Sequence, residues 1–361
     1  MPAWSTKHTD GNSRLPGILN TFRRRVAARA PGGGTVVLEW NTQPGSLVAV
    51  LLPNARRVSI RPDESSDALL RRIMGVEARP ARVLLHIDLT DQRKLPAGRG
   101  RFLGELRRRG IADWNGRLAD ISKPAIQRAN RRLGLPDTTA RRQGPGAELV
   151  IVKTRRNHFG APERELSAEE RDALGYAQRW STPLDGYEEY PVLPRARVPP
   201  SWWRSRALFP ERFITNRRGE FFRVFVAGSH CVLCLCRSRA LVKRPEDARF
   251  DVSVLLTRDR AEDASGARRL PARVWRAFQN AVRFMRAFGL DYGAVDMVRD
   301  DRQVPYIIDV NPTPWAGAAL QREIREYLRG GFGAAGGGPA GSRLRAPART
   351  PRPRPTPPRS P

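Results

Sequence analysis

The segment 290–315, LDYGAVDMVRDDRQVPYIIDVNPTPW, constrains the fold of this chain more than any other segment. Two runs rich in apolar and β-branched residues, 294–298 and 304–310, are separated by the polar residues 299–302. Apolar runs of this length favour strands, and a short segment of Asp and Arg between them favours a turn. The sequence therefore predicts a β-hairpin.

Each arm of this hairpin carries polar side chains where a buried strand should be apolar. Asp296 lies in the first arm, and Asp309 and Asn311 lie at the end of the second. Side chains two residues apart share one face of a strand, and the turn brings Asp296 back toward the other two. Three converging oxygen atoms suit Mg²⁺, which prefers oxygen ligands and leaves room for phosphate. Asp300 and Asp301 are ordinary turn residues on this interpretation, and the alternative is that Asp296 and Asp309 are merely solvated.

Asp296 followed by Asp309-Val310-Asn311 resembles the metal-binding end of the ATP-grasp ligases, and is similar to the D-alanine–D-alanine ligase and glutathione-synthetase-like members. The resemblance covers roughly residues 80 to 328. It implies that ATP binds together with one or two Mg²⁺ ions (or Mn²⁺), and that Asp296, Asp309 and Asn311 hold the metal against the phosphates. The family more often has Glu at the position of Asp309, which is one methylene shorter.

The resemblance also implies the fold class, α/β (α+β), and a division of the chain. An ATP-grasp fold of two α+β subdomains would occupy residues 121–329. A small α/β lobe at 35–120 would precede it, and in this family such a lobe often contributes to the substrate site. The basic segment 1–34 and the Gly-, Pro- and Arg-rich segment 330–361 are predicted to be disordered tails.

Periodicity and turn residues predict the local elements. Ser122 is suited to cap a helix that has Pro124 in its first turn, and Ser167 with Glu170 forms a capping box. The predicted strands are 35–40, 47–52, 82–89, 148–153, 208–214, 220–227 and 231–237, the last three in one antiparallel sheet. The predicted helices, besides the one after Ser122, are 67–74, 100–109, 167–180, 271–288 and 316–328.

Lys123 and Lys153 are two of only five lysines in the chain, and both fall where ATP-grasp members place lysines that contact phosphate. An ammonium group there would neutralise charge on the ATP phosphates. The alternative is that both are solvated residues at the end of a helix or strand. The loop after Lys153 would fold over the phosphates, with Arg155, Arg156 and His158 as possible donors, or would be a plain surface loop.

Residues 209–214, Phe-Pro-Glu-Arg-Phe-Ile, resemble the hinge between the two ATP-grasp subdomains, where adenine is held. Glu211 would accept a hydrogen bond from the exocyclic amine, or approach it through its carbonyl group, while Arg212 and Ile214 offer main-chain groups. Glu220 is the candidate acid for the ribose. The candidate nucleotide-binding residues are therefore Lys123, Lys153, Glu211, Arg212, Phe213, Ile214 and Glu220.

Arg223 is a single charge in the apolar run Phe-Phe-Arg-Val-Phe-Val. A buried charge is unfavourable unless it is paired or meets an anion. The family often has such an arginine directed at the transferred phosphate. Burial against Asp296 or Asp309 is the structural alternative, and the two interpretations are compatible.

The chain carries 65 Lys and Arg residues against 36 Asp and Glu, a formal net charge of +29. Charge of this size supports weak, salt-sensitive attraction to nucleic acid or other polyanions. No helix-turn-helix, zinc-finger or aromatic RNA-binding motif accompanies it. A catalytically weak or inactive ATP-grasp scaffold that binds nucleic acid or another polyanion is therefore the alternative function, and the polar residues of the hairpin argue against it.

No apolar stretch approaches the roughly 20 residues that a membrane span needs, and the amino terminus lacks the apolar core of a secretory signal. Cys231, Cys234 and Cys236 are odd in number and lie in or beside one predicted strand, so a disulfide framework is not expected. We therefore expect a cytoplasmic protein without membrane contact.

The residues and the resemblance together imply an ADP-forming carboxylate–amine or carboxylate–thiol ligase. A carboxylate of a small-molecule or peptide substrate would attack the γ-phosphorus of ATP, and an amine or thiol would then capture the acylphosphate. Lys153 and Arg223 are the candidate catalytic residues, because they would stabilise the charge of the transferred phosphoryl group. No protein nucleophile is needed, and no Ser-His-Asp or Cys-His combination is apparent.

Overall fold

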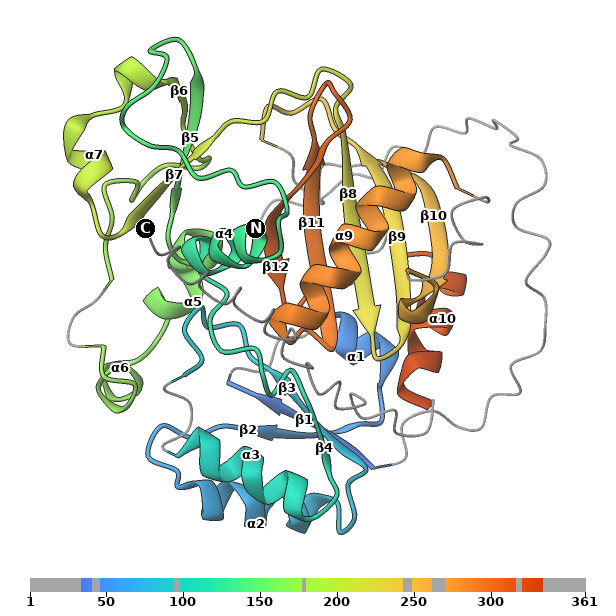
Figure 1. Cartoon of the computed structure of the whole chain (residues 1–361). Coiled ribbons are helices and arrows are strands. Elements are labelled where there is room, and N and C mark those ends of the chain that lie inside the picture. Colours follow the sequence, from blue (N-terminus) through green and yellow to red (C-terminus); the bar gives the residue numbers. More distant parts are fainter. Residues whose placement is uncertain are drawn as a thin grey trace, which may run out of the picture.

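A computed structural model describes residues 34–40, 46–93, 98–176, 180–242, 249–261, 270–315 and 320–333 (Figure 1). Within these residues the fold is mixed α/β, with a four-stranded, a five-stranded and a three-stranded sheet. The predicted tails lie outside the described residues, except for Gly34 and residues 330–333. The latter four residues end a helix, so the predicted tail begins at least four residues too early.

The four-stranded sheet is wholly parallel, in the order β2-β1-β3-β4. Its central strands are continuous apolar runs because both faces are covered. Val36 and Leu38 face the core beneath helices α2 and α3, whereas Val37 faces helix α1. The elements are β1 (Thr35–Glu39), α1 (Leu47–Leu51), β2 (Arg56–Ser59), α2 (Ser66–Val76), β3 (Arg82–His86), α3 (Arg99–Arg108) and β4 (Ala112–Trp114).

The prediction of a strand at 47–52 is wrong, because this segment forms helix α1. Its β-branched and apolar composition favours a strand, but no strand in the described part of the chain pairs with it. Leu47, Val48 and Leu51 instead lie on one face of a helix and are fully buried against helix α10 (Arg322–Gly333) and the sheets. Tertiary packing therefore overrides the local preference.

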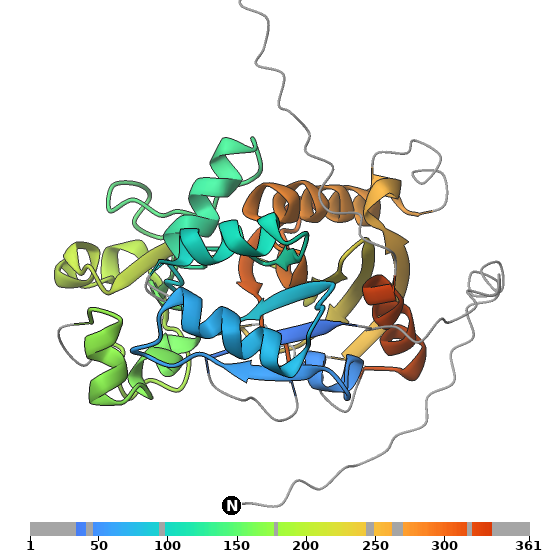
Figure 2. The ribbon, with the colours of Figure 1, turned by 90° about the horizontal axis from the view of Figure 1, so that it is seen from below.

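The five-stranded sheet is antiparallel, in the order β10-β9-β8-β11-β12, and its two faces are covered by different helices (Figure 2). Phe222 and Val224 pack on the side of helix α9, whereas Phe221 and Phe225 pack on the side of helix α10. The predicted hairpin is confirmed as β11 and β12. The strands are β8 (Glu220–Ala227), β9 (His230–Arg237), β10 (Arg249–Thr257), β11 (Tyr292–Arg299) and β12 (Pro305–Asn311), and the helix is α9 (Ala272–Phe288).

The three-stranded sheet, in the order β6-β5-β7, has a small core of its own that includes Val150, Val152 and Leu208. The segment 208–214 was predicted to join the sheet of 220–227, but β7 pairs with β5 instead. The residues after β7 therefore cross from one sheet to the other. The strands are β5 (Leu149–Thr154), β6 (Val192–Pro194) and β7 (Leu208–Arg212).

The remaining elements connect these sheets. Helix α4 begins after the predicted cap, with the Ser122 hydroxyl accepting from the Ala125 N–H. The capping box of Ser167 and Glu170 is also present, but its helix ends at Ala173 rather than near residue 180. These elements are α4 (Lys123–Arg132), α5 (Ala161–Arg164), α6 (Ala168–Ala173), α7 (Pro200–Arg204), η2 (Asn157–Gly160), η3 (Arg195–Arg197) and η5 (Arg258–Ala261).

None of the helices in the described ranges is both long enough and apolar enough to cross a membrane. The three cysteines are buried free thiols on strand β9. Burial raises the pKa of Cys231 and Cys234 to about 11. They are therefore core residues rather than reactive thiols.

His86 at the end of β3 gives the fold a pH-dependent contribution to stability. Its Nδ1 lies 3.1 Å from Glu39 Oε1, and both side chains are 1% exposed. Burial lowers the pKa of His86, although Glu39 opposes this effect. The folded chain therefore holds fewer protons on this residue than the unfolded chain, whose His pKa is about 6.5.

We predict that stability falls as the pH drops below about 6.5, with a contribution from His86 of up to about 1.4 kcal/mol per pH unit. Urea unfolding between pH 7.5 and 5.5 measures the slope. His86→Gln should flatten it, because Gln does not titrate. Equal slopes in wild type and His86→Gln would contradict the prediction.

Candidate active site

Three charged residues lie in one row across the five-stranded sheet. The β11 residue Asp296 is the register partner of Arg223 on β8 and of Asp309 on β12. Arg223 Nε lies 2.9 Å from Asp296 Oδ1. The sheet register, fixed by the apolar residues on either side, therefore brings three of the predicted site residues together.

A β-bulge sets the direction of Asp309. The pairing of β11 with β12 runs regularly to Asp296 and Asp309, and then resumes at Met297 and Ile307, so that Ile308 is an extra residue on β12. Bulges of this kind commonly re-aim a side chain beside a functional site. Both Ile308 and Asp309 line the same cavity as a result.

Asn311, predicted as the third metal ligand, does not line this cavity. Its Oδ1 accepts hydrogen bonds from the Thr313 N–H at 2.9 Å and the Thr313 hydroxyl at 3.4 Å. The side chain thus stabilises the turn that follows β12. Of the predicted metal ligands, the structure brings together Asp296 and Asp309.

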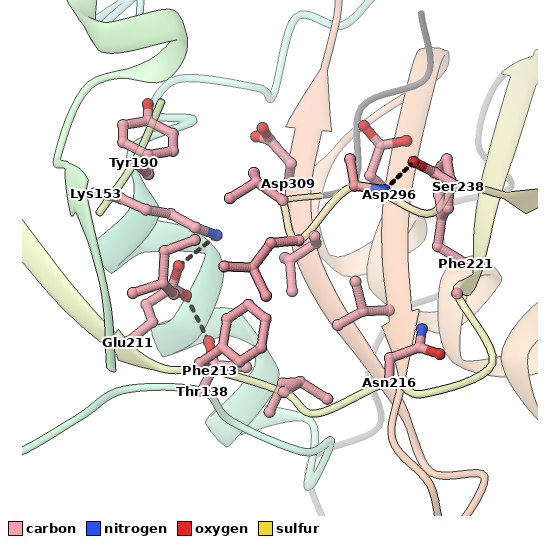
Figure 3. Close-up of a pocket in the computed structure, with 18 of the residues that line it drawn as sticks. Thr138, Lys153, Tyr190, Glu211, Phe213, Asn216, Phe221, Ser238, Asp296 and Asp309 are labelled. Atoms are coloured by element: carbon pink, nitrogen blue, oxygen red, sulfur yellow. Dashed lines mark hydrogen bonds and ion pairs between the residues drawn. The ribbon is translucent and has the colours of Figure 1, made fainter. Parts of the chain in front are cut away.

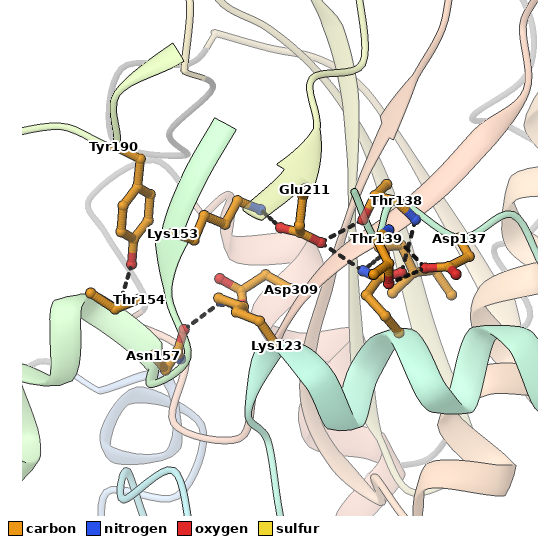
Figure 4. A network of polar contacts seen from close by, with 12 residues as sticks. Lys123, Asp137, Thr138, Thr139, Lys153, Thr154, Asn157, Tyr190, Glu211 and Asp309 are labelled. Atoms are coloured by element: carbon orange, nitrogen blue, oxygen red, sulfur yellow. Dashed lines mark hydrogen bonds and ion pairs between the residues drawn. The ribbon is translucent and has the colours of Figure 1, made fainter. Parts of the chain in front are cut away.

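Lys123 is the first residue of helix α4, and its side chain is 2% exposed. Its Nζ donates to Asp309 Oδ1 at 2.5 Å and to Asn157 Oδ1 at 2.9 Å (Figure 4). The backbone N–H donates to the Arg155 carbonyl at 3.0 Å, which fixes the start of the helix. Nothing in the sequence around Asn157 indicates this role.

Lys153 on β5 is buried beside Glu211 on β7. The two side chains form an ion pair of 2.6 Å. Glu211 also accepts from the Thr138 hydroxyl at 2.5 Å and from Gln127 Nε2 at 3.0 Å (Figure 4). These donors therefore occupy the carboxylate that was predicted to accept from adenine, and the backbone of Glu211 pairs with Ile151 of β5. Thr138 and Gln127 were not predicted from the sequence, since they lie 73 and 84 residues from Glu211.

Burial and the ion pairs act in opposite directions on the pKa values of these groups. Burial raises the pKa of Asp296, although Arg223 opposes it. Burial acts in the same sense on Asp309, but the attraction and hydrogen bond of Lys123 outweigh it and lower the pKa of Asp309. Burial tends to lower the pKa of Lys153, and Glu211 outweighs this effect to raise it. Asp309 and Lys153 are thus held in their charged forms at neutral pH.

These side chains line a cavity of about 1400 Å³ between the three-stranded and five-stranded sheets (Figure 3). Apolar side chains such as Ile151, Phe213 and Val298 form part of its wall. Among the described lining residues, positive charge exceeds negative charge, which suits a polyanionic ligand. The cations are Lys123, Lys153, Arg212, Arg217, Arg218, Arg223, Arg237 and Arg239, and the carboxylates are Glu188, Glu211, Asp296 and Asp309.

The segment that follows β7 forms one side of the cavity. The N–H groups of Arg212 and Phe213 donate to the carbonyls of Thr138 and Leu149, at 2.6 and 2.9 Å. The N–H of Ile214, in contrast, has no acceptor within the part of the chain that the structure describes. A ligand with an acceptor at its edge can bind there.

Glu220, predicted to bind ribose, is not brought to the cavity. Its carboxylate pairs with Arg237 at 3.3 Å and with Arg299. The three candidate donors of the loop after Lys153 do not line one cavity. His158 lines the cavity described above, whereas Arg155 and Arg156 line a second, smaller one.

No group of three or more His, Cys, Asp or Glu side chains in the described ranges could hold a metal ion alone. Asp296 and Asp309 supply two carboxylates on neighbouring strands. Mg²⁺ commonly binds through one or two carboxylates and completes its shell with substrate phosphates and water. The donor set therefore fits a Mg²⁺ ion that arrives with a phosphate ligand.

No protein-family model and no curated protein matches this chain. Solved structures of ATP-grasp ligases do match it. The ligase PsnB in complex with a minimal precursor, Mg and ADP is 16% identical, with a TM-score of 0.42 over 83% of this chain and 97% of PsnB. The macrocyclase MdnC from Microcystis aeruginosa MRC, bound with precursor peptide MdnA, is 12% identical, with a TM-score of 0.39 over 81% and 98%.

An L-amino acid ligase from Bacillus licheniformis is 11% identical to this chain, with a TM-score of 0.43 over 83% of this chain and 74% of the ligase. The three matched proteins are thus an ATP-grasp ligase, a macrocyclase and an L-amino acid ligase. At TM-scores of 0.39 to 0.43, the function of this chain has to follow from its own residues.

The Lys153–Glu211 pair allows a test of what holds the site together. Lys153→Met leaves the buried carboxylate without a counter-charge, and should lower the free energy of unfolding by roughly 3–5 kcal/mol. Adding Glu211→Gln removes that charge and keeps an acceptor for Thr138. We therefore predict that the double variant is more stable than Lys153→Met alone.

Urea unfolding followed by tryptophan fluorescence measures both variants. Arg101→Met is the control, because the Arg101–Asp67 pair is exposed, and it should change stability by less than about 1 kcal/mol. A double variant no more stable than the single one would show that an unpaired buried charge is not the cause.

Proposed function

We propose that this chain is an ATP-grasp ligase that uses ATP and Mg²⁺ to activate a substrate carboxylate. The observation that carries the proposal is the row of Arg223, Asp296 and Asp309, which faces Lys123 and Lys153 across one cavity. Cations for phosphate and carboxylates for a metal ion are thus provided by different elements at one place. Such an arrangement is what phosphoryl transfer requires of a protein.

In the proposed complex the adenine base would lie at the segment after β7. Ile151, Phe213 and Ile214 provide apolar wall, and the Ile214 N–H is open to an acceptor on the base. The N–H groups of Arg212 and Phe213 already donate to carbonyl groups, so these two residues would line the adenine site without donating to the base. The phosphates would then extend toward Lys123 and Lys153, whose ammonium groups would move from the carboxylates to phosphate oxygens.

Asp296 and Asp309 would hold the Mg²⁺ ion, and Asn311 would join them after its Oδ1 leaves Thr313. When bound, the ion supplies positive charge that neutralises the phosphates. Lys123 and Arg223, which now pair with these carboxylates, become available for phosphate oxygens. The pairing with Lys123 therefore keeps Asp309 ionised before the nucleotide binds.

In the proposed reaction an oxygen of the substrate carboxylate attacks the γ-phosphorus, and the bond to the β,γ-bridging oxygen breaks to release ADP. Arg223 and Lys153 stabilise the negative charge of the transferred group. An amine or thiol then attacks the acyl carbon, forming an amide or thioester and releasing phosphate and a proton. The chain provides positions and charge, and no side chain forms a covalent bond.

The alternative, a polyanion-binding scaffold without catalysis, is favoured by the net charge of +29. It gives no reason for the two carboxylates at the centre of a positively charged cavity, because they would repel a polyanion unless a metal ion intervened. Mg²⁺-dependent nucleotide binding separates the two functions.

We predict that the chain binds ATP with a Kd in the micromolar-to-millimolar range typical of enzyme substrates, and that Mg²⁺ strengthens this binding. Asp309→Asn should weaken the Mg²⁺ dependence, because it removes one charge from the metal site. Asp301→Asn should not, because Asp301 lies in the exposed hairpin turn, 3.5 Å from Arg217.

Titration calorimetry of the wild type and both variants, with and without Mg²⁺, measures these affinities. An absence of heat with millimolar MgATP would contradict the proposed function. Equal Mg²⁺ dependence in wild type and Asp309→Asn would mean that Asp309 is not a ligand, and the metal site would then have to be sought elsewhere.

A further inference from the structure

One face of helix α4 covers the edge of the five-stranded sheet. Within the described residues β12 is the last strand of that sheet, so only β11 pairs with its backbone. Lys123, Gln127 and Asn130 are four and three residues apart, which places their side chains on one face of the helix. All three are buried, and each donates a hydrogen bond to β12. Side chains of α4 therefore take the place of a neighbouring strand.

The amides of Gln127 and Asn130 meet at a single backbone carbonyl group. Gln127 Nε2 lies 3.2 Å and Asn130 Nδ2 lies 3.1 Å from the carbonyl oxygen of Ile307. Ile307 immediately precedes the bulge residue Ile308, and Asp309 follows it. A bulge interrupts the hydrogen-bond ladder, and a buried carbonyl group without a donor is destabilising. The two amides therefore hold the backbone at the point where the bulge turns Asp309 toward the cavity.

The orientation of the Gln127 amide is set by contacts on both of its polar atoms. Nε2 also donates to Glu211 Oε1 at 3.0 Å, and Oε1 accepts from Asn130 Nδ2 at 3.0 Å and from the Thr138 N–H at 3.2 Å. Exchanging the nitrogen and oxygen of either amide would bring an oxygen against other acceptors. This buried network thus links the bulge of β12 to Glu211 on β7 through helix α4 (Figure 4 shows Thr138 and Glu211 above the helix).

We propose that Gln127, supported by Asn130, is a positioning residue for the metal carboxylate Asp309. Neither amide lines the cavity, so both act through the backbone of β12. The inference rests on the proposed function, in which Lys123 leaves Asp309 for a phosphate oxygen when the nucleotide binds. The contact that holds Asp309 before binding is then lost, whereas the amides remain on the Ile307 carbonyl. They keep the carboxylate directed at the Mg²⁺ ion during the reaction.

Gln127→Met removes both amide contacts and keeps a side chain of similar length. Calorimetry of the full chain gives the Kd of ADP without and with Mg²⁺, and the ratio of the two measures the metal contribution. This ratio should fall toward one in Gln127→Met, because removing a group that orients a metal ligand commonly weakens metal binding about tenfold or more. The Kd of ADP without Mg²⁺ should change by a much smaller factor, because Thr138 and Lys153 still hold Glu211.

Gln92→Met is the matched control. Gln92 is also a fully buried glutamine whose Nε2 donates to a backbone carbonyl group, that of Ile87 at 2.9 Å, but it lies away from β12 and lines no cavity described above. Urea unfolding should show that both variants are less stable than wild type, whereas the Mg²⁺ ratio should fall in Gln127→Met alone. An equal fall in both variants would overturn the inference and leave Gln127 with a role in stability only.

Asn130→Leu is the second variant, and it decides the question if Gln127→Met does not fold. It removes one of the two donors to Ile307 and keeps Gln127 Nε2, so the ratio should fall in the same direction by a smaller factor. A wild-type ratio in Asn130→Leu would then overturn the inference.

The wild-type ratio separates this inference from the proposed function. A wild-type ratio of one would overturn the proposed function, and the inference with it. A ratio above one that Gln127→Met retains would overturn the inference alone. Equal weakening of ADP binding with and without Mg²⁺ in Gln127→Met would also overturn it, because the amide would then act through Glu211 rather than through Asp309.

Discussion

The candidate active site depends on buried ion pairs that join separate elements. Lys123 at the start of α4 pairs with Asp309 on β12, and Lys153 on β5 pairs with Glu211 on β7. A buried charge is strongly destabilising unless it is paired and hydrogen-bonded. Each pair therefore fixes the position of a cation that the cavity needs. The pairing of Lys123 with Asp309 also ties α4 to the five-stranded sheet at the point where the proposed reaction takes place.

The two kinds of pair have different consequences for the proposed function. Glu211 is held by Thr138 and Gln127 as well as by Lys153, so its carboxylate keeps partners when the lysine turns toward phosphate. Asp296 and Asp309 have fewer alternatives, and in the proposed function a metal ion would replace their cations. In the proposed function the cavity would remain charge-compensated before and after nucleotide binding, because the lysines and the carboxylates would exchange one set of partners for another.

The hairpin and the helix capped by Ser122 could be predicted from the sequence, because both are encoded by neighbouring residues. Asp296 and Asp309 could be placed together for the same reason, since one turn connects their strands. Asn311 could not be placed, because its orientation depends on the turn with Thr313 rather than on strand alternation. The pairing of Glu220 with Arg237 and Arg299 depends on how strands β8, β9 and β11 align, which no local pattern specifies.

The sequence predictions fail where the structure depends on packing between segments that are far apart in the chain. The segment 47–52 has strand-like composition but forms a helix against α10, which follows more than 270 residues later. The second cavity brings together Arg93, Ser122, Arg156 and Tyr176, and no spacing in the sequence connects them. The sequence therefore predicts that Asp296 and Asp309 lie together, but it does not predict the second cavity.

The central claim is that Asp296 and Asp309 bind a divalent cation only together with nucleotide phosphates. Electron paramagnetic resonance of Mn²⁺ tests it directly, because the signal of free Mn²⁺ disappears on binding. Mn²⁺ should bind weakly to the chain alone, where Lys123 and Arg223 compensate the carboxylates, and more tightly to the chain with ADP than to ADP in solution. Loss of this enhancement in Asp296→Asn would agree with the account. Tight binding of Mn²⁺ without nucleotide, or no enhancement with ADP, would contradict it.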